Sequence, residues 1–140
     1  MRIIISLIVF LLTMVELRAA DRINFFHIGL EQGLSQSTVV DIIQDKRENM
    51  WIATHNGLNR YDGYDFTVYH HNDADTSSIA SDVIRSLALD ESGKIWIGTG
   101  AGLSLYNPEL DIFYNYSCVC EGKKQQVLDV ACLEEGNLLV

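Results

Sequence analysis

The sequence predicts an all-β fold, and three observations lead to this prediction. The stretch Glu48–Tyr61 returns forty-five residues later as Gly93–Tyr106. Each copy consists of short β-branched and aliphatic runs separated by turns that contain Asp, Asn or Gly. A period of about 40–50 residues built from short strands is typical of β-propeller blades. We therefore expect an incomplete β-propeller, about two and a half blades of four-stranded antiparallel sheet, after an N-terminal signal peptide.

The residues that recur define the repeat. Trp51 and Trp96 stand at equivalent places, and a residue found in each copy usually serves the repeat, so we interpret both as blade core instead of sugar-stacking platforms. Side chains alternate along a strand, so the small Ala53 and Gly98, on the same face, are expected to leave room for an adjacent sheet. The structural repeat positions are Trp51, Gly57, Tyr61, Asp90, Gly93, Trp96, Gly102 and Tyr106.

The strands of each copy follow from the same pattern. We expect strands at residues 23–28, 39–44, 66–69, 83–89, 94–99, 103–106 and 111–116. The turn after residue 89 ends in Gly93, which accepts a positive φ. Its counterpart is Glu48, so the left-handed conformation is expected at Asn49 instead.

Residues 127–140 begin a third, degenerate copy. With Gly136 aligned to Gly93 the spacing is 43, and Leu139 then replaces the repeat tryptophan. Propellers close with about four to eight blades. We therefore expect residues 21–140 to be the N-terminal blades of a longer, truncated propeller whose third repeat is incomplete.

The first twenty residues are set apart from the repeats. Arg2 precedes an apolar run over residues 3–15, and Ala19-Ala20 supplies a small-residue cleavage site. The run is short for a bilayer span. We interpret residues 1–20 as a signal peptide that exports the chain to the periplasm, with an uncleaved membrane anchor as the alternative.

The chain is acidic, with 10 Lys and Arg residues against 19 Asp and Glu residues and a net charge of −9. Residues 1–20 hold two of the basic residues and one of the acids, so the net charge of the remainder is −10. Phosphate binding needs clustered Lys and Arg, so we expect no nucleic-acid partner for this segment. Neutral ligands such as glycans remain compatible with this charge.

No residue pattern indicates a metal or a cofactor. Cys118, Cys120 and Cys132 have no nearby histidine, so free thiols are the preferred interpretation, and a Cys120–Cys132 disulfide across a hairpin stays open. Residues 73–84 begin like an EF-hand loop but lack its glycine and its final glutamate, so a calcium site is rejected.

These motifs resemble two-component regulator propeller repeats. The pattern Asp-x-x-Gly-x-x-Trp-Ile-Gly-Thr-x-x-Gly-Leu-x-x-Tyr is complete over residues 90–106 and departs at Glu48 and Ala53 over residues 45–61. Phe25-Phe-His-Ile28, followed by Gly33-Leu-Ser-Gln-Ser-Thr-Val39, is similar to the start of the periplasmic sensor region of hybrid two-component systems in Gram-negative polysaccharide degraders.

The resemblance implies a larger protein. In that family two periplasmic propellers and a β-sandwich precede a membrane helix, a histidine kinase, a receiver and a DNA-binding domain. An oligosaccharide changes the geometry of the homodimer, and phosphotransfer then switches on catabolic genes. None of the downstream motifs stands in this sequence. The segment is therefore expected to be a ligand-sensing module without catalysis or cofactor, in a protein anchored in the inner membrane.

Two other functions stay open: a secreted propeller enzyme, either a lyase or a glycan-active hydrolase, and a protein-binding scaffold. An enzyme needs acids and bases that converge in a pocket, whereas Asp45 and Asp90 recur at turn positions. For ligand contact the candidates are His55, Asn56 and Arg60, because they depart from the residues at the same places of the second copy. The family motif itself nominates no binding residue.

A propeller segment of fewer than three blades leaves apolar blade faces and strand edges uncovered. We therefore predict that residues 21–140 alone self-associate or unfold with poor cooperativity, as measured by light scattering and thermal melting. A sharp two-state melt of a monodisperse monomer would contradict this prediction.

Overall fold

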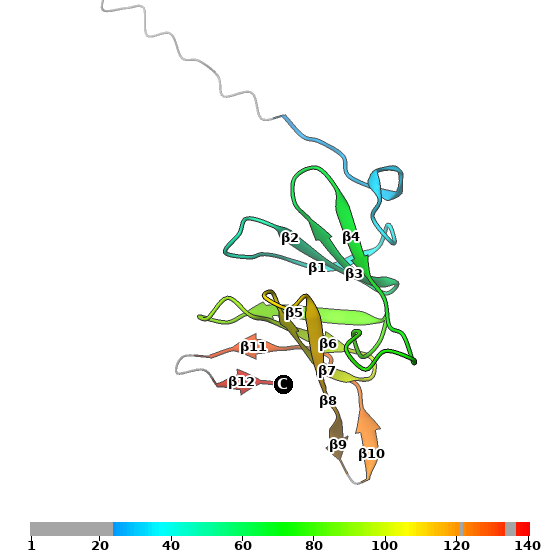
Figure 1. Cartoon of the computed structure of the whole chain (residues 1–140), viewed down its shortest axis with the longest axis vertical. Helices are drawn as coiled ribbons and strands as arrows, with labels where there is room; N and C mark the ends of the chain where they lie inside the picture. The colour runs from blue at the N-terminus through cyan, green and yellow to red at the C-terminus, as the bar shows by residue number, and fades with distance from the viewer. Residues whose placement is uncertain (1–23, 121, 134–136) are drawn as a thin grey trace, which may run out of the picture.

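A computed structural model describes residues 24–120, 122–133 and 137–140, and the predicted signal peptide lies outside these residues. The described chain is built from short strands and one turn of 3-10 helix (Figure 1). The elements are η1 (Leu30–Gln32), β1 (Val39–Gln44), β2 (Met50–Thr54), β3 (Gly57–Tyr61), β4 (Phe66–Tyr69), β5 (Ile84–Leu89), β6 (Ile95–Thr99), β7 (Gly102–Asn107), β8 (Ile112–Tyr116), β9 (Cys118–Cys120), β10 (Lys123–Gln125), β11 (Ala131–Cys132) and β12 (Leu138–Leu139).

Two four-stranded antiparallel sheets, β1-β2-β3-β4 and β5-β6-β7-β8, confirm the predicted blades, and we call them blade 1 and blade 2. In Figure 1 the blades are stacked, with the pair β11–β12 on the far side of blade 2. The first strands of the two blades lie side by side, and β11 lies next to β5. This convergence of first strands is the arrangement of propeller blades around an axis.

The third copy keeps the register of the repeat. Strand β11 pairs with β12 through Ala131↔Leu139 and Cys132↔Leu138. The same two pairs, 43 residues earlier, join β5 to β6. The degenerate copy therefore forms the same strand pair as blade 2, even though Leu139 stands in place of the tryptophan.

An aspartate in the first turn of each blade ties that turn to the repeat tryptophan. The Asp45 carboxylate accepts hydrogen bonds from the backbone N–H of Asn49 (2.9 Å) and from the indole N–H of Trp51 (2.8 Å). Asp90 accepts the indole N–H of Trp96 at 3.3 Å. Burial alone would raise the pKa of Asp45, but the hydrogen bonds from Asn49 and Trp51 together hold that pKa below its usual value.

The prediction that Asn49 takes the left-handed conformation is wrong. Glu48 itself has a φ of 68°, close to the 86° of Gly93 at the same place in blade 2. The reason is Asp45, which binds both the backbone N–H and the side-chain amide of Asn49 and so fixes that residue immediately before β2. The positive φ is left to Glu48.

The main core lies between the two blades, as expected for the repeat tryptophan of blade 1. Trp51 is fully buried, and its ring stacks on Tyr69 with centroids 5.7 Å apart and contacts Tyr106 of blade 2 at 4.6 Å. Its interpretation as blade core is therefore confirmed. The buried cluster consists of Trp51, Ala53, Leu58, Ile79, Ile84, Leu87, Ile95, Ile97, Tyr106 and Phe113.

A second, smaller core lies between blade 2 and the third copy. A Cβ added to Gly98 would lie 3.0 Å from Val127 and 3.3 Å from Val130, so the missing side chain leaves room for the neighbouring unit, as predicted. Trp96 packs against this cluster but is half-buried. Cys118 and Cys132, at its border, are free thiols.

The predicted strand at residues 23–28 is wrong over the part that the structure describes. Residues 24–29 adopt no strand, and the side chains of Phe25 and Phe26 are 90% and 86% exposed. No described strand pairs with this segment, and without a neighbour a strand lacks its ladder of backbone hydrogen bonds.

We predict that Trp51→Phe lowers the free energy of unfolding by about 1–3 kcal/mol, because it keeps a ring in the core but leaves Asp45 without its indole donor. Trp96→Phe is the matched control, since that indole bond is longer and its ring is half-buried. Urea unfolding followed by circular dichroism measures both. Equal losses for the two variants would contradict a special role for the Asp45–Trp51 bond.

Candidate functional site

Two of the three predicted ligand-contact residues lie together at one end of blade 1. His55 and Asn56 form the exposed turn between β2 and β3. The backbone N–H of His55 donates to the side chain of Gln36 (3.0 Å), and the amide of Asn56 donates to the carbonyl of Ser35 (3.2 Å). The segment that leads into β1 therefore fixes the turn while both side chains reach the surface.

Arg60, the third candidate, lies elsewhere. It belongs to the other end of β3, where its guanidinium sits 5.9 Å from the ring centre of Trp51 and 5.7 Å from that of Tyr69. It donates to the Tyr106 hydroxyl at 3.2 Å and lies 3.7 Å from the Asp111 carboxylate. The structure thus explains the departure of Arg60 from the repeat by contacts between the blades, and it does not bring Arg60 to the turn at residues 55–56.

Asp111 is the centre of a polar cluster that sequence reasoning missed. The hydroxyls of Tyr69 and Tyr106 both donate to one of its carboxylate oxygens, at 2.7 and 2.6 Å. The Tyr106 hydroxyl is the main reason that the pKa of Asp111 lies below its usual value, with smaller contributions from Tyr69 and Arg60. Burial, in turn, raises the pKa of the Tyr69 hydroxyl. The indication of this cluster in the sequence was Arg60, because an uncharged residue, Leu105, stands at its place in the second copy.

The remaining structural repeat residues act as scaffold. Gly57 and Gly102 open β3 and β7, and both have a positive φ. Tyr61 stacks on Phe66 with ring centres 4.8 Å apart, whereas its counterpart Tyr106 enters the core between the blades.

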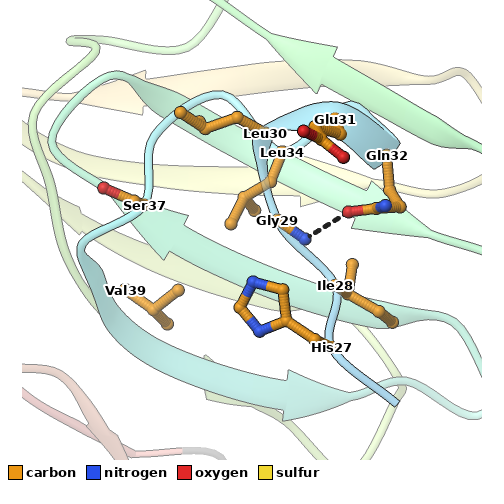
Figure 2. A pocket seen from close by; sticks show the side chains of 9 residues that line it. All are labelled: His27, Ile28, Gly29, Leu30, Glu31, Gln32, Leu34, Ser37 and Val39. Atoms are coloured by element: carbon orange, nitrogen blue, oxygen red, sulfur yellow. Dashed lines mark hydrogen bonds between the residues drawn. The ribbon is translucent and has the colours of Figure 1, made fainter.

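A surface cavity of about 400 Å³ lies under the N-terminal segment (Figure 2). The side chains of His27, Glu31 and Ser37 border it, Leu34 and Val39 line it, and the Gly29 N–H donates to the Gln32 side chain at 2.8 Å. The full lining of the cavity consists of His27, Ile28, Gly29, Leu30, Glu31, Gln32, Leu34, Ser37 and Val39.

This cavity adjoins the uncovered face of blade 1. A neighbouring groove is apolar and includes Ile42, Met50 and Ile52. Met50 and Ile52 of blade 1 occupy the same places in the repeat as Ile95 and Ile97 of blade 2. Ile95 and Ile97 are buried completely or nearly so between the two blades. The groove therefore has the chemistry of a blade-packing face, not of a site for a polar ligand.

The described residues contain no group of three or more His, Cys, Asp or Glu side chains arranged to hold a metal ion. The described part of the chain also has no helix with the length and apolarity that a membrane crossing requires.

Comparison with known proteins identifies the repeat. The family described as two component regulator propeller matches residues 33–56 and 78–101. These segments cover the β1–β2 and β5–β6 hairpins of the two blades with the residues that lead into them. The repeat in the sequence and the repeat of the family therefore coincide.

Individual relatives agree with this family. A protein named Histidine kinase P4 from Formosa agariphila is 42% identical over 79 residues, which are 55% of this chain and 6% of that protein. The crystal structure of the extracellular domain of BT3049 from B. thetaiotaomicron, described as a hybrid two component system, is 34% identical, with a TM-score of 0.64 over 75% of this chain and 15% of that domain. The extracellular domain of BT4673 from the same organism, 20% identical, shares the fold with a TM-score of 0.62 over 84% of this chain and 17% of its own length. The chain thus spans a small part of each relative.

The Asp111 cluster gives a prediction about acid stability. A carboxylate with a lowered pKa stabilises the fold above its unfolded value of about 3.8, and this stabilisation is lost as the pH falls through its lower folded pKa. We expect Asp111→Asn to lower the free energy of unfolding by about 1 kcal/mol at neutral pH and by less at acid pH. Asparagine also tolerates the φ of 56° at this position.

Thermal melts of both proteins from neutral pH down to about pH 2, well below the ordinary carboxyl pKa, measure this effect. Glu109→Gln, an exposed change of the same charge in the same turn, is the control. A difference between Asp111→Asn and the parent that stays constant over this pH range would contradict the assignment.

Proposed function

Since this chain carries two-component regulator propeller repeats, we propose that it forms the first blades of the ligand-sensing, extracytoplasmic part of a hybrid two-component regulator. The observation that carries the proposal is the likeness of the two stacked blades to the extracellular domain of BT3049, at 34% identity over 75% of the chain. In this proposal residues 1–20 export the chain to the periplasm. The rest of the regulator is a homodimer anchored in the inner membrane.

The interactions of the recurrent acids support a binding module over an enzyme. The carboxylates of Asp45 and Asp90 accept backbone and indole hydrogen bonds within their own blades. The Asp111 carboxylate is engaged by two tyrosine hydroxyls and lies near Arg60. Groups held in this way serve the scaffold, so catalysis is assigned to no residue of this segment.

The ligand that we propose is an oligosaccharide, in accordance with the resemblance to sensors of polysaccharide degraders. The net charge of −9 disfavours polyanions and leaves neutral glycans compatible. The exposed turn at His55 and Asn56 is the contact surface that we assign, because the His55 N–H and the Asn56 side chain tie it to residues 35–36 while both residues remain exposed to solvent. Side chains of this kind can donate to and accept from sugar hydroxyls.

Calorimetric titration of the protein with neutral linear oligosaccharides of glucose, xylose, mannose and arabinose tests this proposal. We expect saturable binding of one of these classes and an affinity about tenfold lower for the double variant His55→Ala/Asn56→Ala, because two hydrogen-bonding side chains are lost. Asp65→Asn, in the turn at the other end of blade 1, is the control.

Two outcomes would contradict the proposal. Conversion of an oligosaccharide into smaller products would favour the propeller enzyme. Absence of binding to all four classes, together with capture of a protein partner by the blade ends, would favour the scaffold.

A further inference from the structure

The connection between blade 1 and blade 2, residues 70–83, is fastened to both blades. Its Ser77 carbonyl accepts the Phe113 N–H (2.9 Å), and its Ser78 carbonyl accepts the Asn115 side chain (2.7 Å), so its second half is held by β8. The Asp82 carbonyl accepts the N–H of Gly57 at 2.8 Å, which links its end to the start of β3. The connection therefore contacts the end of blade 1 that carries residues 55–56.

Within the connection, the imidazole of His71 bridges two points that lie apart in the sequence. Its Nδ1 lies 2.7 Å from the carbonyl oxygen of Ile79, and its Nε2 lies 3.0 Å from a carboxylate oxygen of Asp73. The backbone N–H of the same residue donates to the Asp82 carboxylate at 2.7 Å. His71 thus joins the beginning of the connection to its middle and to its end.

Both ring nitrogens of His71 face acceptors, and this has a chemical consequence. A carbonyl oxygen and a carboxylate can only accept, so each nitrogen has to donate for both contacts to be hydrogen bonds. A neutral imidazole carries one N–H, whereas the imidazolium carries two. When the ring is neutral and keeps its bond to Ile79, the lone pair of Nε2 faces the carboxylate of Asp73, and that contact becomes repulsive.

The charges around His71 act in the same direction. Asp73 and Asp82 are the carboxylates that face it, and both favour the cation. His70 is adjacent and has its Nδ1 3.2 Å from the Asp82 carboxylate. The residues of blade 2 that bind the connection, Ser104, Phe113 and Asn115, carry no charge.

We propose that His71 is a proton-dependent clamp, which closes the connection between the two blades when its imidazole is protonated and releases Asp73 when it is neutral. The inference concerns the fold of this chain and does not depend on the identity of any ligand. The ordinary histidine transition lies near pH 6.5. A segment outside the cytoplasm meets the pH of its surroundings, so such a clamp would register acidification at the blade end.

The direction of the titration agrees with the geometry. The hydrogen bond to the Ile79 carbonyl, and then that to Asp73, raise the pKa of His71 above its usual value. A group whose pKa is raised by folding stabilises the folded form fully below its unfolded pKa and loses this stabilisation as the pH rises through the folded pKa. The clamp is therefore closed in mildly acidic solution and opens as the pH rises past the shifted transition.

Two measurements on the full chain test the clamp. Proton NMR of the histidine ring signals gives the midpoint for His71, which we expect above that of free histidine. Hydrogen exchange, corrected for intrinsic rates, reports on the N–H of His71 and the N–H groups of residues 74–78, which we expect to be several-fold better protected below that midpoint than above it. Each unit of upward shift in the pKa corresponds to about a tenfold preference for the closed form.

Variants separate the clamp from a general effect of charge. Asp73→Asn should lower the His71 midpoint and reduce the change in protection, and His71→Asn should abolish the pH dependence of exchange in residues 74–78. Asp65→Asn removes the same charge at the other end of blade 1 and should change neither. A His71 midpoint at or below that of free histidine, an unchanged midpoint in Asp73→Asn, or equal protection on both sides of the midpoint would each overturn the proposal.

Discussion

The hydrogen bond from the indole of Trp51 to the carboxylate of Asp45 is the interaction on which the rest of the structure depends. It joins the two properties that a blade needs, a closed turn and a large apolar side chain held in one orientation on the sheet face. A tryptophan buried completely must place its N–H on an acceptor, and the turn supplies that acceptor from six residues away. The same link recurs at Asp90 and Trp96, although it is longer where the neighbouring unit covers the ring less fully.

Residues that do not recur in the second copy then fasten one blade to the next. The Asp41 carboxylate of β1 accepts the Leu87 N–H of β5 at 2.8 Å, and Lys46 donates to the Glu91 carbonyl in the turn of blade 2. Arg60 and Asp111 add the cluster around the two tyrosine hydroxyls. The stacking surface is thus common to the two blades, while the polar contacts are particular to this pair and select its geometry.

The separation between recurring core residues and non-recurring polar residues has a consequence for function. Side chains that recur are occupied by the scaffold, so the proposed function assigns recognition to the blade ends. There the turn at residues 55–56 and the connection at residues 70–83 meet through Gly57 and Asp82. Loops held by a rigid framework are the usual carriers of binding. A titrating histidine in that connection would place the surface under the control of its surroundings without disturbing the core.

The sequence by itself determined the blades. The strands, the register of the third copy and the burial of Trp51 follow from a forty-five-residue repeat, because turns and the pairing of successive strands are set by residues close together in the sequence. The strand expected at residues 23–28 failed because a strand needs a partner, which no local pattern supplies. Only the tertiary structure decided which contacts Arg60, Asp111 and Asp41 make. Their partners lie in the other blade, and a sequence repeat carries no information about contacts between its copies.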